Sequence, residues 1–419
     1  MGVGRVRLVA VSVAAAALAA PATASAHATL LRTVPAAGAV LTHAPSAVRV
    51  VFDDTVAVGS GNAAVANGSR ASVQDGPPQA HGHVLVIPLR PHLRDGDYSV
   101  RWSIVSDDGH RERGVLAFAV GRGRAPPASI LTAAVPLGIS DVVFRSLFYL
   151  GLLTAAGTAA FGLLVRRFAP LLETRLAHLL FFSLLVAFVG CSGLVRDATA
   201  STRYGLVLDV ALGVAALGAA AAALAPRVRP LRLPAAACSL LLIAAPTLSG
   251  HALDDDQPWA LSIAADLVHV AAAAVWLGGL ASLLVVLTRA DLTPDDRDAI
   301  LRRFSRAALR AVAALAASGL LRAVTELRAV DQLWTTTYGR ALLVKAGLLL
   351  PLLGLGYLNR SRLLGGYAGL RRSVRAELVL LVAVVATVSV LVQLRPGRAA
   401  PPGRYSGVAG PLDPSPPSR

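Results

Sequence analysis

Eight apolar runs of about 17 to 25 residues constrain the fold of this chain more than any other feature. When helical, a run of that length matches the thickness of the hydrocarbon core of a bilayer. Only 15% of the 419 residues are charged, against about 25% in an ordinary soluble domain. The sequence therefore predicts an all-α polytopic membrane domain of about eight transmembrane helices within residues 139–394. The runs cover roughly 140–165, 176–195, 204–225, 233–250, 261–288, 307–327, 339–359 and 376–394.

The arginines between these runs predict the orientation of the chain. If residue 139 lies outside, the connections on the inner side carry sixteen arginines and those on the outer side carry three. Arginine and lysine accumulate on the cytoplasmic side of membrane proteins. We therefore expect a multi-pass protein of the plasma (inner) membrane, with the segments before residue 139 and after residue 394 both extracytoplasmic. The same distribution accounts for the net charge of +16, so membrane lipid, and no nucleic acid, is the expected partner.

Residues 1–26 are typical of a secretory signal peptide. Arg5 and Arg7 precede an apolar stretch that is too short to span a bilayer, and small residues end the segment at Ala26. An uncleaved N-terminal anchor is the alternative. Cleavage after Ala26 would make His27 the new N-terminus, whose α-amine and imidazole Nδ1 can chelate one metal ion. Nitrogen ligands in a tetragonal arrangement suit Cu(II).

Residues 27–121 contain short β-type runs separated by turn residues, including 48–52, 84–87, 98–105 and 115–120. Alternating strands over about 95 residues predict a small all-β Greek-key sandwich or barrel. Residues 122–138 have the composition of a linker. The Pro-rich tail, residues 395–419, is expected to be disordered.

The segment Ser106-Asp107-Asp108-Gly109-His110 carries the strongest candidate ligands in this β region. Asp108 and His110 lie two residues apart around a glycine turn, so a carboxylate and an imidazole can be directed at one point. The alternative is a plain turn with a solvated histidine. Together with the two nitrogens of His27, this pair would supply three nitrogens and one oxygen.

These residues resemble the CopC family of periplasmic copper-binding proteins, and the resemblance covers essentially all of residues 27–121. It implies a cupredoxin-like β-barrel with a Cu(II) site made by His27, Asp108 and His110. Some members of the family also have a Met-rich Cu(I) site, which this chain lacks because its only methionine is Met1. The resemblance is carried by His27-Ala28, Val34-Pro35, Gly38, Phe52, Ser106, Asp108-Gly109-His110, Gly114 and Phe118.

Ionisable residues inside the predicted spans are functional candidates, because burying them in lipid is costly. Asp266 and His269 lie three residues apart and share one helix face, so Asp266 could orient the imidazole. His251 ends the fourth run, and Lys345 lies near the start of the seventh. We expect His251, Asp266, His269 and Lys345 to form a copper path, unless Lys345 extends to the membrane surface and His251 is interfacial.

The membrane region resembles the CopD family of copper-resistance membrane proteins over about residues 140–394. It implies passage of copper across the inner membrane, generally inward, so the whole chain resembles a CopC–CopD fusion. The resemblance is carried by Ser249-Gly250-His251, His269, Val275 to Leu280, Phe304-Ser305-Arg306, Ser318-Gly319, Tyr338-Gly339-Arg340, Lys345 and Asn359.

The combined prediction is a copper-binding membrane protein, and not an enzyme, that captures Cu(II) outside and passes copper inward. Periplasmic or extracellular copper donors are possible partners. The sequence lacks a P-loop motif, so ATP-driven pumping is not expected. One alternative is a membrane-anchored copper buffer or sensor. Another is a redox protein that holds copper, or haem bound through His178, His251 and His269.

Overall fold

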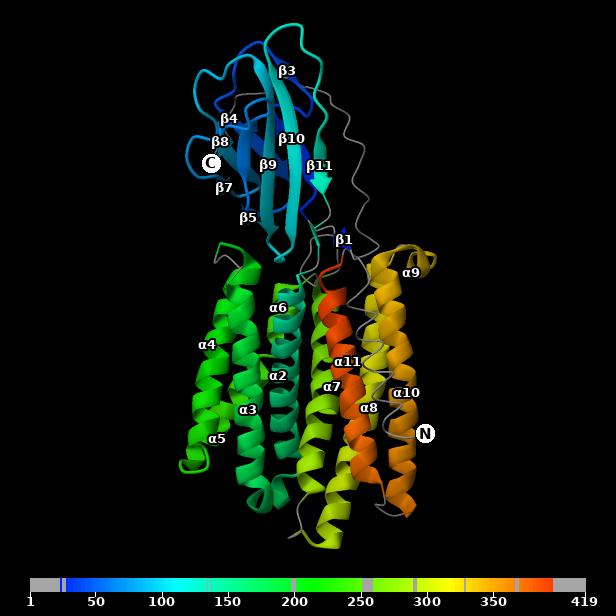
Figure 1. Ribbon diagram of the computed structural model, residues 1–419. Coiled ribbons are helices and arrows are strands. Elements are labelled where there is room, and N and C mark those ends of the chain that lie inside the picture. Colours follow the sequence, from blue (N-terminus) through cyan, green and yellow to red (C-terminus); the bar gives the residue numbers. More distant parts are fainter. Residues whose placement is uncertain are drawn as a thin grey trace. The chain divides into compact units, whose positions relative to one another are not determined.

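The computed structural model describes residues 23–24, 28–133, 135–136, 138–196, 201–250, 259–288, 292–327, 329–365 and 369–394. The described chain forms two compact units. Among the described residues, one unit contains residues 28–135 and consists of strands, and the other contains residues 136–394, which are mainly helical, together with residues 23–24 (Figure 1). A fold of strands followed by membrane-type helices is the fold class that the sequence predicted.

Two sheets make up the β unit, and the chain alternates between them. The first sheet has the order β2 (Leu30–Val34), β4 (Ala47–Phe52), β8 (Val84–Pro88) and β7 (Gln79–His81). The second has the order β11 (Ile130–Ala133), β10 (Arg111–Val120), β9 (Gly96–Ser106) and β5 (Val56–Val58), with β3 (Val40–Leu41) beside β10 and β6 (Ala63–Ala66) beside β9. The short strands β1 (Thr23–Ala24) and β12 (Val135–Pro136) lie outside these two sheets.

The inward side chains of both sheets form one core, as the alternating pattern of the strands requires. Phe52 from β4 and Trp102 from β9 are almost fully buried and meet edge to face, with ring centroids 5.4 Å apart. Phe118 from β10 is also completely buried, and Tyr98 stacks on it. Because the two sheets share this core, the β unit is a sandwich.

The β unit extends further along the chain than the sequence suggested. Residues 130–133 lie within the expected linker of 122–138, but they form strand β11, which pairs antiparallel with β10. Leu131 packs against the core of the β unit. At Gly114 a Cβ atom would collide with the backbone carbonyl of Leu131, so glycine permits the close approach of the two strands. This local requirement is not visible in the linker's own composition.

Within the residues that the structure describes, the helical unit contains eight candidate membrane spans, as the sequence predicted. Its longer helices run alongside one another (Figure 1). In chain order, its helices are α2 (Ile139–Leu164), α3 (Ala169–Val195), α4 (Arg203–Leu224), α5 (Arg232–Leu241), α6 (Ala244–Ser249), α7 (Trp259–Val286), α8 (Pro294–Glu326), α9 (Gln332–Thr335), α10 (Thr337–Gly365) and α11 (Leu370–Leu391), with 3-10 turns η1 (Arg166–Phe168) and η2 (Arg229–Leu231).

Two spans differ in detail from the prediction. The fourth span, expected to be one helix over 233–250, is divided into α5 and α6. The sixth, expected from residue 307, begins at Pro294, so residues 294–306 of the inner connection are already helical. Thr293 caps this helix by accepting a hydrogen bond from the backbone N–H of Asp296, and Asp295 and Asp296 occupy its first turn. Proline at the first turn and acidic residues near it are favourable at a helix N-terminus.

Helices α2 and α7 pack backbone to backbone through glycine. A Cβ atom on Gly157 would collide with the carbonyl oxygen of Ala274, and one on Gly278 would lie 2.6 Å from the carbonyl oxygen of Thr154. One turn along, Ser282 Oγ donates to Thr158 Oγ1 at 3.2 Å, and both residues are buried. Small residues permit this kind of approach in membrane helices. Helix α7 also packs against α8 and α11, and α11 against α10.

Candidate functional site

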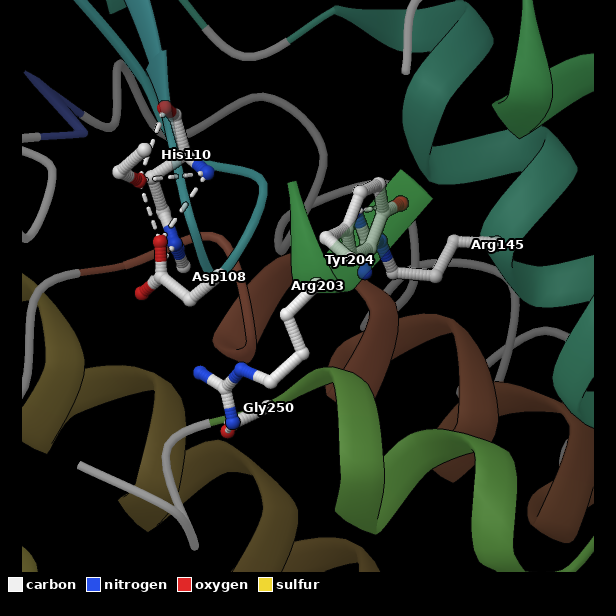
Figure 2. A network of polar contacts seen from close by, with 7 residues as sticks. Asp108, His110, Arg145, Arg203, Tyr204 and Gly250 are labelled. Carbon is white, nitrogen blue, oxygen red and sulfur yellow. Dashed lines mark hydrogen bonds and ion pairs between the residues drawn. The ribbon is translucent and has the colours of Figure 1, made fainter. Parts of the chain in front are cut away.

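The first candidate site lies in the loop between the long strands β9 and β10. Residues 107–110 connect the strands, and the backbone N–H of Ser106 donates to the carbonyl of His110 at 2.8 Å. Gly109 has a φ of 87°, a conformation that glycine adopts without strain. The Asp-Gly sequence therefore closes the hairpin tightly and brings the side chains of Asp108 and His110 to one side of the loop, where they point toward each other (Figure 2).

We call Asp108 and His110 the hairpin site. His110 Nδ1 lies 3.0 Å from Asp108 Oδ2, and the side chains are 10% and 2% exposed. Asp108 Oδ1 accepts a hydrogen bond from Ser106 Oγ and another, at 3.3 Å, from the backbone N–H of His110. Ser106 itself is completely buried. Hydrogen bonds from within the loop therefore fix Oδ1 of the carboxylate, while Oδ2 faces the imidazole.

The geometry of the hairpin site fits two ligands of one metal ion. Two donor atoms bound side by side to a first-row metal at about 2 Å lie roughly 2.8 to 3.0 Å apart, close to the separation of Nδ1 and Oδ2 here. Without a metal, the same atoms pair with each other. The sequence prediction that Asp108 and His110 are directed at one point agrees with this arrangement.

Asp54 is a member of the surroundings that the sequence reasoning missed. Burial and, to a smaller extent, the negative charges of Asp108, Asp107 and Asp53 raise its pKa to about 6. Three neighbouring carboxylates thus oppose ionisation of Asp54 in this part of the β unit, an arrangement that a bound cation would stabilise. The sequence signal that could have identified Asp54 is the adjacent pair Asp53 and Asp54 directly after β4. Their proximity to the loop of residues 107–110, however, depends on the sheet topology.

His27, the third predicted ligand, lies outside the described residues. The nearest described part of the chain is Ala28, which is completely buried, and Thr29. The backbone N–H of Thr29 donates to Asp53 Oδ1 at 2.6 Å, and the carbonyl of Thr29 accepts from the backbone N–H of Asp53 at 3.1 Å. Residues 28 and 29 are thereby fixed next to Asp53, which is adjacent in sequence to Asp54, the carboxyl group that Asp108 also influences.

A second candidate site lies within the helical unit around His269 of α7. His269 Nδ1 lies 3.1 Å from Ser318 Oγ of α8, and Nε2 lies 3.5 Å from Lys345 Nζ of α10. Ser318 Oγ donates to the carbonyl of Ala314 at 2.6 Å, so it accepts a hydrogen bond from Nδ1–H of the imidazole. This assignment leaves Nε2 with its lone pair directed toward Lys345.

Asp266 does not orient His269, contrary to our expectation from the spacing of the two residues. Its carboxylate lies 3.9 Å from Arg322 Nε of α8, and Arg322 also forms an ion pair of 2.6 Å with Glu326. Ser318 takes the orienting role instead, because it occupies the position next to Nδ1. We call the six residues that meet here the helix cluster: Asp266, His269, Ser318, Arg322, Glu326 and Lys345.

The helix cluster brings together part of the predicted membrane set and adds further residues to it. His269 and Lys345 are brought together as expected, although 76 residues separate them. His251 lies outside the described residues. Ser318, Arg322 and Glu326 were not singled out from the sequence, because arginine and glutamate near the end of a long helix resemble ordinary surface residues.

Glycine at position 319 leaves room for the imidazole of His269. A Cβ atom at Gly319 would lie 3.1 Å from His269 Cε1 and 3.5 Å from Nδ1. The Ser318-Gly319 pair thus supplies both a hydrogen-bond partner and space for the ring. Among the described residues, no group of three or more His, Cys, Asp or Glu side chains is arranged to hold a metal ion. Each candidate site therefore provides at most two protein ligands of these types within the described chain.

Two protein families match separate parts of this chain. The CopC domain family matches residues 30–121, and the family described as copper resistance protein D, CopD, matches residues 298–391. The first match contains the hairpin site, and the second contains Ser318, Arg322, Glu326 and Lys345 of the helix cluster. His269 and Asp266 precede the second match.

Similar proteins cover either the whole chain or its β unit. The copper transport protein CutJ of Bacillus subtilis is 28% identical, over 91% of this chain and 76% of its own length. Protein YobA of Escherichia coli is 34% identical over 98 residues, which are 23% of this chain and 79% of YobA. The solved structure of CopC from Methylosinus trichosporium OB3b is 24% identical with a TM-score of 0.21, covering 23% of this chain and 97% of that one.

Proposed function

Because the chain belongs to the CopC–CopD group of copper-resistance proteins, we propose a function in copper transport. In this proposal the protein captures Cu(II) outside the plasma membrane and passes copper inward. The observation that carries the proposal is the hairpin site, a carboxylate and an imidazole 3.0 Å apart in a chain that continues into a membrane bundle with its own histidine. Copper is the transported substrate here, and we propose a transporter and not an enzyme.

Capture of Cu(II) requires more ligands than the hairpin site provides. We propose that His27, as the mature N-terminus, supplies its amine and imidazole nitrogens. His27 directly precedes the buried Ala28, and the next residue, Thr29, is hydrogen-bonded to Asp53. Because consecutive Cα atoms are about 3.8 Å apart, these contacts limit how far His27 can lie from Asp53. Three nitrogens and one oxygen suit the tetragonal preference of Cu(II). The chain has no methionine beyond Met1, so a thioether site for Cu(I) is not part of the proposal.

The orientation of the membrane domain supports an extracytoplasmic β unit. Sixteen arginines in the proposed inner connections and three in the outer ones agree with the positive-inside rule. With eight spans, the segments before the first and after the last lie on the same side. The helix cluster then opens toward that side, because His269 is ten residues from the start of α7 and Lys345 eight from the start of α10.

Fusion of the two units favours transfer of copper between them. A tethered donor raises the effective concentration of copper at the acceptor without any additional contact. In the helix cluster, Nε2 of His269 is the nitrogen available to accept copper, and Ser318 fixes the ring through Nδ1. The cations Lys345 and Arg322 are balanced by Asp266 and Glu326. We infer a site that binds copper transiently.

The proposed capture site is tested by electron paramagnetic resonance of Cu(II) bound to the purified full-length protein. We expect a tetragonal signal with nitrogen ligation in the mature protein. The signal should be lost or greatly weakened by His110→Ala and by one extra residue before His27. His81→Ala is the matched control, because His81 is exposed and interacts with Gln79 in β7. An unchanged signal in the extended protein would contradict the role of His27.

The direction of transport is tested by measuring copper in whole cells. Deletion should lower intracellular copper if the protein imports it. A rise would indicate export, and an unchanged level would favour the buffer or sensor alternative.

The haem alternative is tested by the visible spectrum of the purified protein. Nothing in the described structure favours it, since the ring nitrogens of His269 face Ser318 and Lys345.

A further inference from the structure

A second buried polar cluster lies near the opposite end of the helical bundle from His269. Glu377 of α11 is 2% exposed, and Asn359 of α10 is 8% exposed. Asn359 Nδ2 donates to Glu377 Oε1, and the indole of Trp276 in α7 also hydrogen-bonds to this carboxyl group. Glu377 is seven residues from the start of α11, and Asn359 is six from the end of α10. Three helices therefore converge on one buried carboxyl group.

Two oxygen atoms close to Glu377 in the fold have no hydrogen-bond partner within the described structure. They are Asn359 Oδ1 and Ser373 Oγ, both on buried residues. Ser373 precedes Glu377 by four residues, so the two share one face of α11, with Ser373 nearer the end of the helix. An unpaired polar atom in an apolar interior is unfavourable. The cluster thus has the capacity to accept a further hydrogen-bonding group.

The donor atoms of this cluster suit a proton better than a metal ion. Ca²⁺ and Mg²⁺ require six or more oxygen ligands, whereas the side chains here offer one carboxyl group, one amide oxygen and one hydroxyl. Copper prefers nitrogen and sulfur ligands, and the Trp276 indole is only a donor. A carboxyl group needs one proton to become neutral, and neutralisation removes the cost of keeping its charge in the membrane.

Several charged or titratable groups lie on α11 and on the helices packed against it, and one of them, Arg360, pairs elsewhere. Arg360, next to Asn359 on α10, is exposed and donates to Ser305 Oγ of α8 at 3.2 Å. Helix α11 itself carries the exposed Arg371, Arg372 and Arg375. The helices packed against it carry the following groups: Asp141, Arg145 and Tyr149 on α2, Asp266 and His269 on α7, and Tyr338, Arg340, Lys345, Tyr357, Arg360 and Arg362 on α10.

Helix α7 connects this cluster to the helix cluster. Trp276 follows His269 by seven residues, so the two lie on the same face of α7 and about 10 Å apart along its axis. Any shift or rotation of α7 that accompanies copper binding at His269 therefore displaces the indole that donates to Glu377. This hydrogen bond is the physical means by which one site can affect the other.

We propose that Glu377, with Asn359, Trp276 and Ser373 around it, is a proton-binding site whose protonation and release accompany each passage of copper. The inference rests on the proposed transport function. The step is a proton transfer alone: an O–H bond forms on the carboxylate, its negative charge is neutralised, and the bond breaks again on release. No electrons are exchanged. Since Glu377 lies near the inner end of the bundle in the proposed orientation, the proton comes from the inner side through Ser373 and is released toward the outer side, so that copper entry raises the internal pH.

The test uses the full chain reconstituted in phospholipid vesicles that contain a pH-sensitive dye. Copper is added outside, and internal copper and internal pH are recorded together for the wild type and Glu377→Gln. The glutamine keeps the size and an acceptor oxygen of the side chain but cannot bind the proton. Glu173→Gln is the matched control, because Glu173 of α3 pairs with Arg232 away from this cluster. Infrared spectroscopy of the same samples detects the protonated carboxyl group directly.

We expect copper entry to change the internal pH in the wild type and in the control. In Glu377→Gln the ratio of protons to copper should fall at least tenfold, and one pH-dependent carboxyl band should disappear from the infrared spectrum. An equal ratio in Glu377→Gln, or copper entry without any pH change in the wild type, would overturn the proposal but leave the transport function intact. If the wild type moves no copper, the transport function fails. The infrared band then decides whether Glu377 is still a proton site.

Discussion

The hairpin site and the helix cluster both centre on one histidine, but they are built in opposite ways. Asp108 and His110 are two residues apart in one loop, and Asp54 adds a further carboxyl group to their surroundings. His269 instead meets Ser318 and Lys345 from two other helices, 49 and 76 residues away in sequence. The first site collects negative charge, whereas the second places a cation beside its imidazole.

This difference suits two successive steps of copper handling. A cation is attracted to a group of carboxylates and held there, so the hairpin site is suited to retention at low copper concentration. A lysine next to the histidine opposes tight binding of a second cation, so the helix cluster is suited to passage. In the proposed function, the charges around two similar imidazole rings thus separate tight binding of copper at the hairpin site from its passage at the helix cluster.

The strongest test of this comparison sets His110→Ala against His269→Ala in copper uptake by vesicles. We expect His110→Ala to raise the copper concentration needed for half-maximal uptake about 100-fold, since loss of even an indirect ligand contact costs 10- to 100-fold in metal affinity. The maximal rate should stay the same. His269→Ala should lower the maximal rate and leave the half-maximal concentration nearly unchanged. The opposite pattern would show that the roles of the two sites are reversed.

Replacing Lys345 with methionine should convert the helix cluster from a passage site to a retention site. Removal of the positive charge 3.5 Å from Nε2 should increase the amount of copper retained by the membrane domain about tenfold at subsaturating copper. The measurement is equilibrium dialysis with metal analysis, in a His110→Ala background that disables the hairpin site. Arg340→Met is the control, because Arg340 is exposed on the same helix. Equal retention by both variants would contradict the assigned role of Lys345.

Asp54→Asn should weaken Cu(II) binding at the hairpin site about fivefold, because it removes one nearby negative charge. The same substitution should stabilise the metal-free protein. Burial raises the pKa of Asp54 to about 6 from 3.8, so the folded state binds this proton more tightly than the unfolded state. Stability therefore falls as pH rises from about 4 to about 6, and the loss is complete above that range.

The melting temperature of the metal-free β unit, measured in the full chain, checks this pH dependence. Asp54→Asn should raise it most at pH 7.5, where Asp54 is charged, and only about half as much at pH 5, midway between the two pKa values. Asp75→Asn, in an exposed loop of the same unit, should have no effect at either pH. A gain of equal size at both pH values would mean that the charge of Asp54 is not the cause.

The smallest effect is expected at the glycine beside His269. In Gly319→Ala the added methyl group would lie 3.1 Å from the imidazole, so the ring must shift, and we expect about a threefold lower maximal rate of uptake. Gly347→Ala places the same group in open space on α10 and should have no effect. Identical rates for the two variants would show that the position of the ring does not limit passage.

Local and distant interactions explain which features the sequence revealed. Asp108 and His110 could be predicted because both lie in one hairpin loop, whose shape follows from Asp-Gly. The eight spans could be predicted because each is a continuous apolar run. Ser318 as the partner of His269 could not be predicted, because the packing of α7 against α8 determines it. Spacing within one helix pointed to Asp266 instead, which pairs with Arg322.

Glu377 and strand β11 were missed for similar reasons. Glu377 lies close to the expected start of the last span, where a charged residue needs no explanation, and only the contact with Asn359 shows that it is buried. Residues 130–133 look like a linker until Gly114 of the neighbouring strand permits close pairing. In both cases the decisive partner is on a different element of the fold.

The glycine contact between α2 and α7 limits how the helical unit can change shape. Ala274 and Gly278 rest directly on the backbone of α2, with no flexible side chains between the two helices. These two helices are therefore expected to move together as one rigid body, and His269 belongs to it because it lies on α7. Rearrangements that let an ion past the imidazole are then movements of this pair of helices, as one body, relative to α8 and α10, which contribute Ser318 and Lys345.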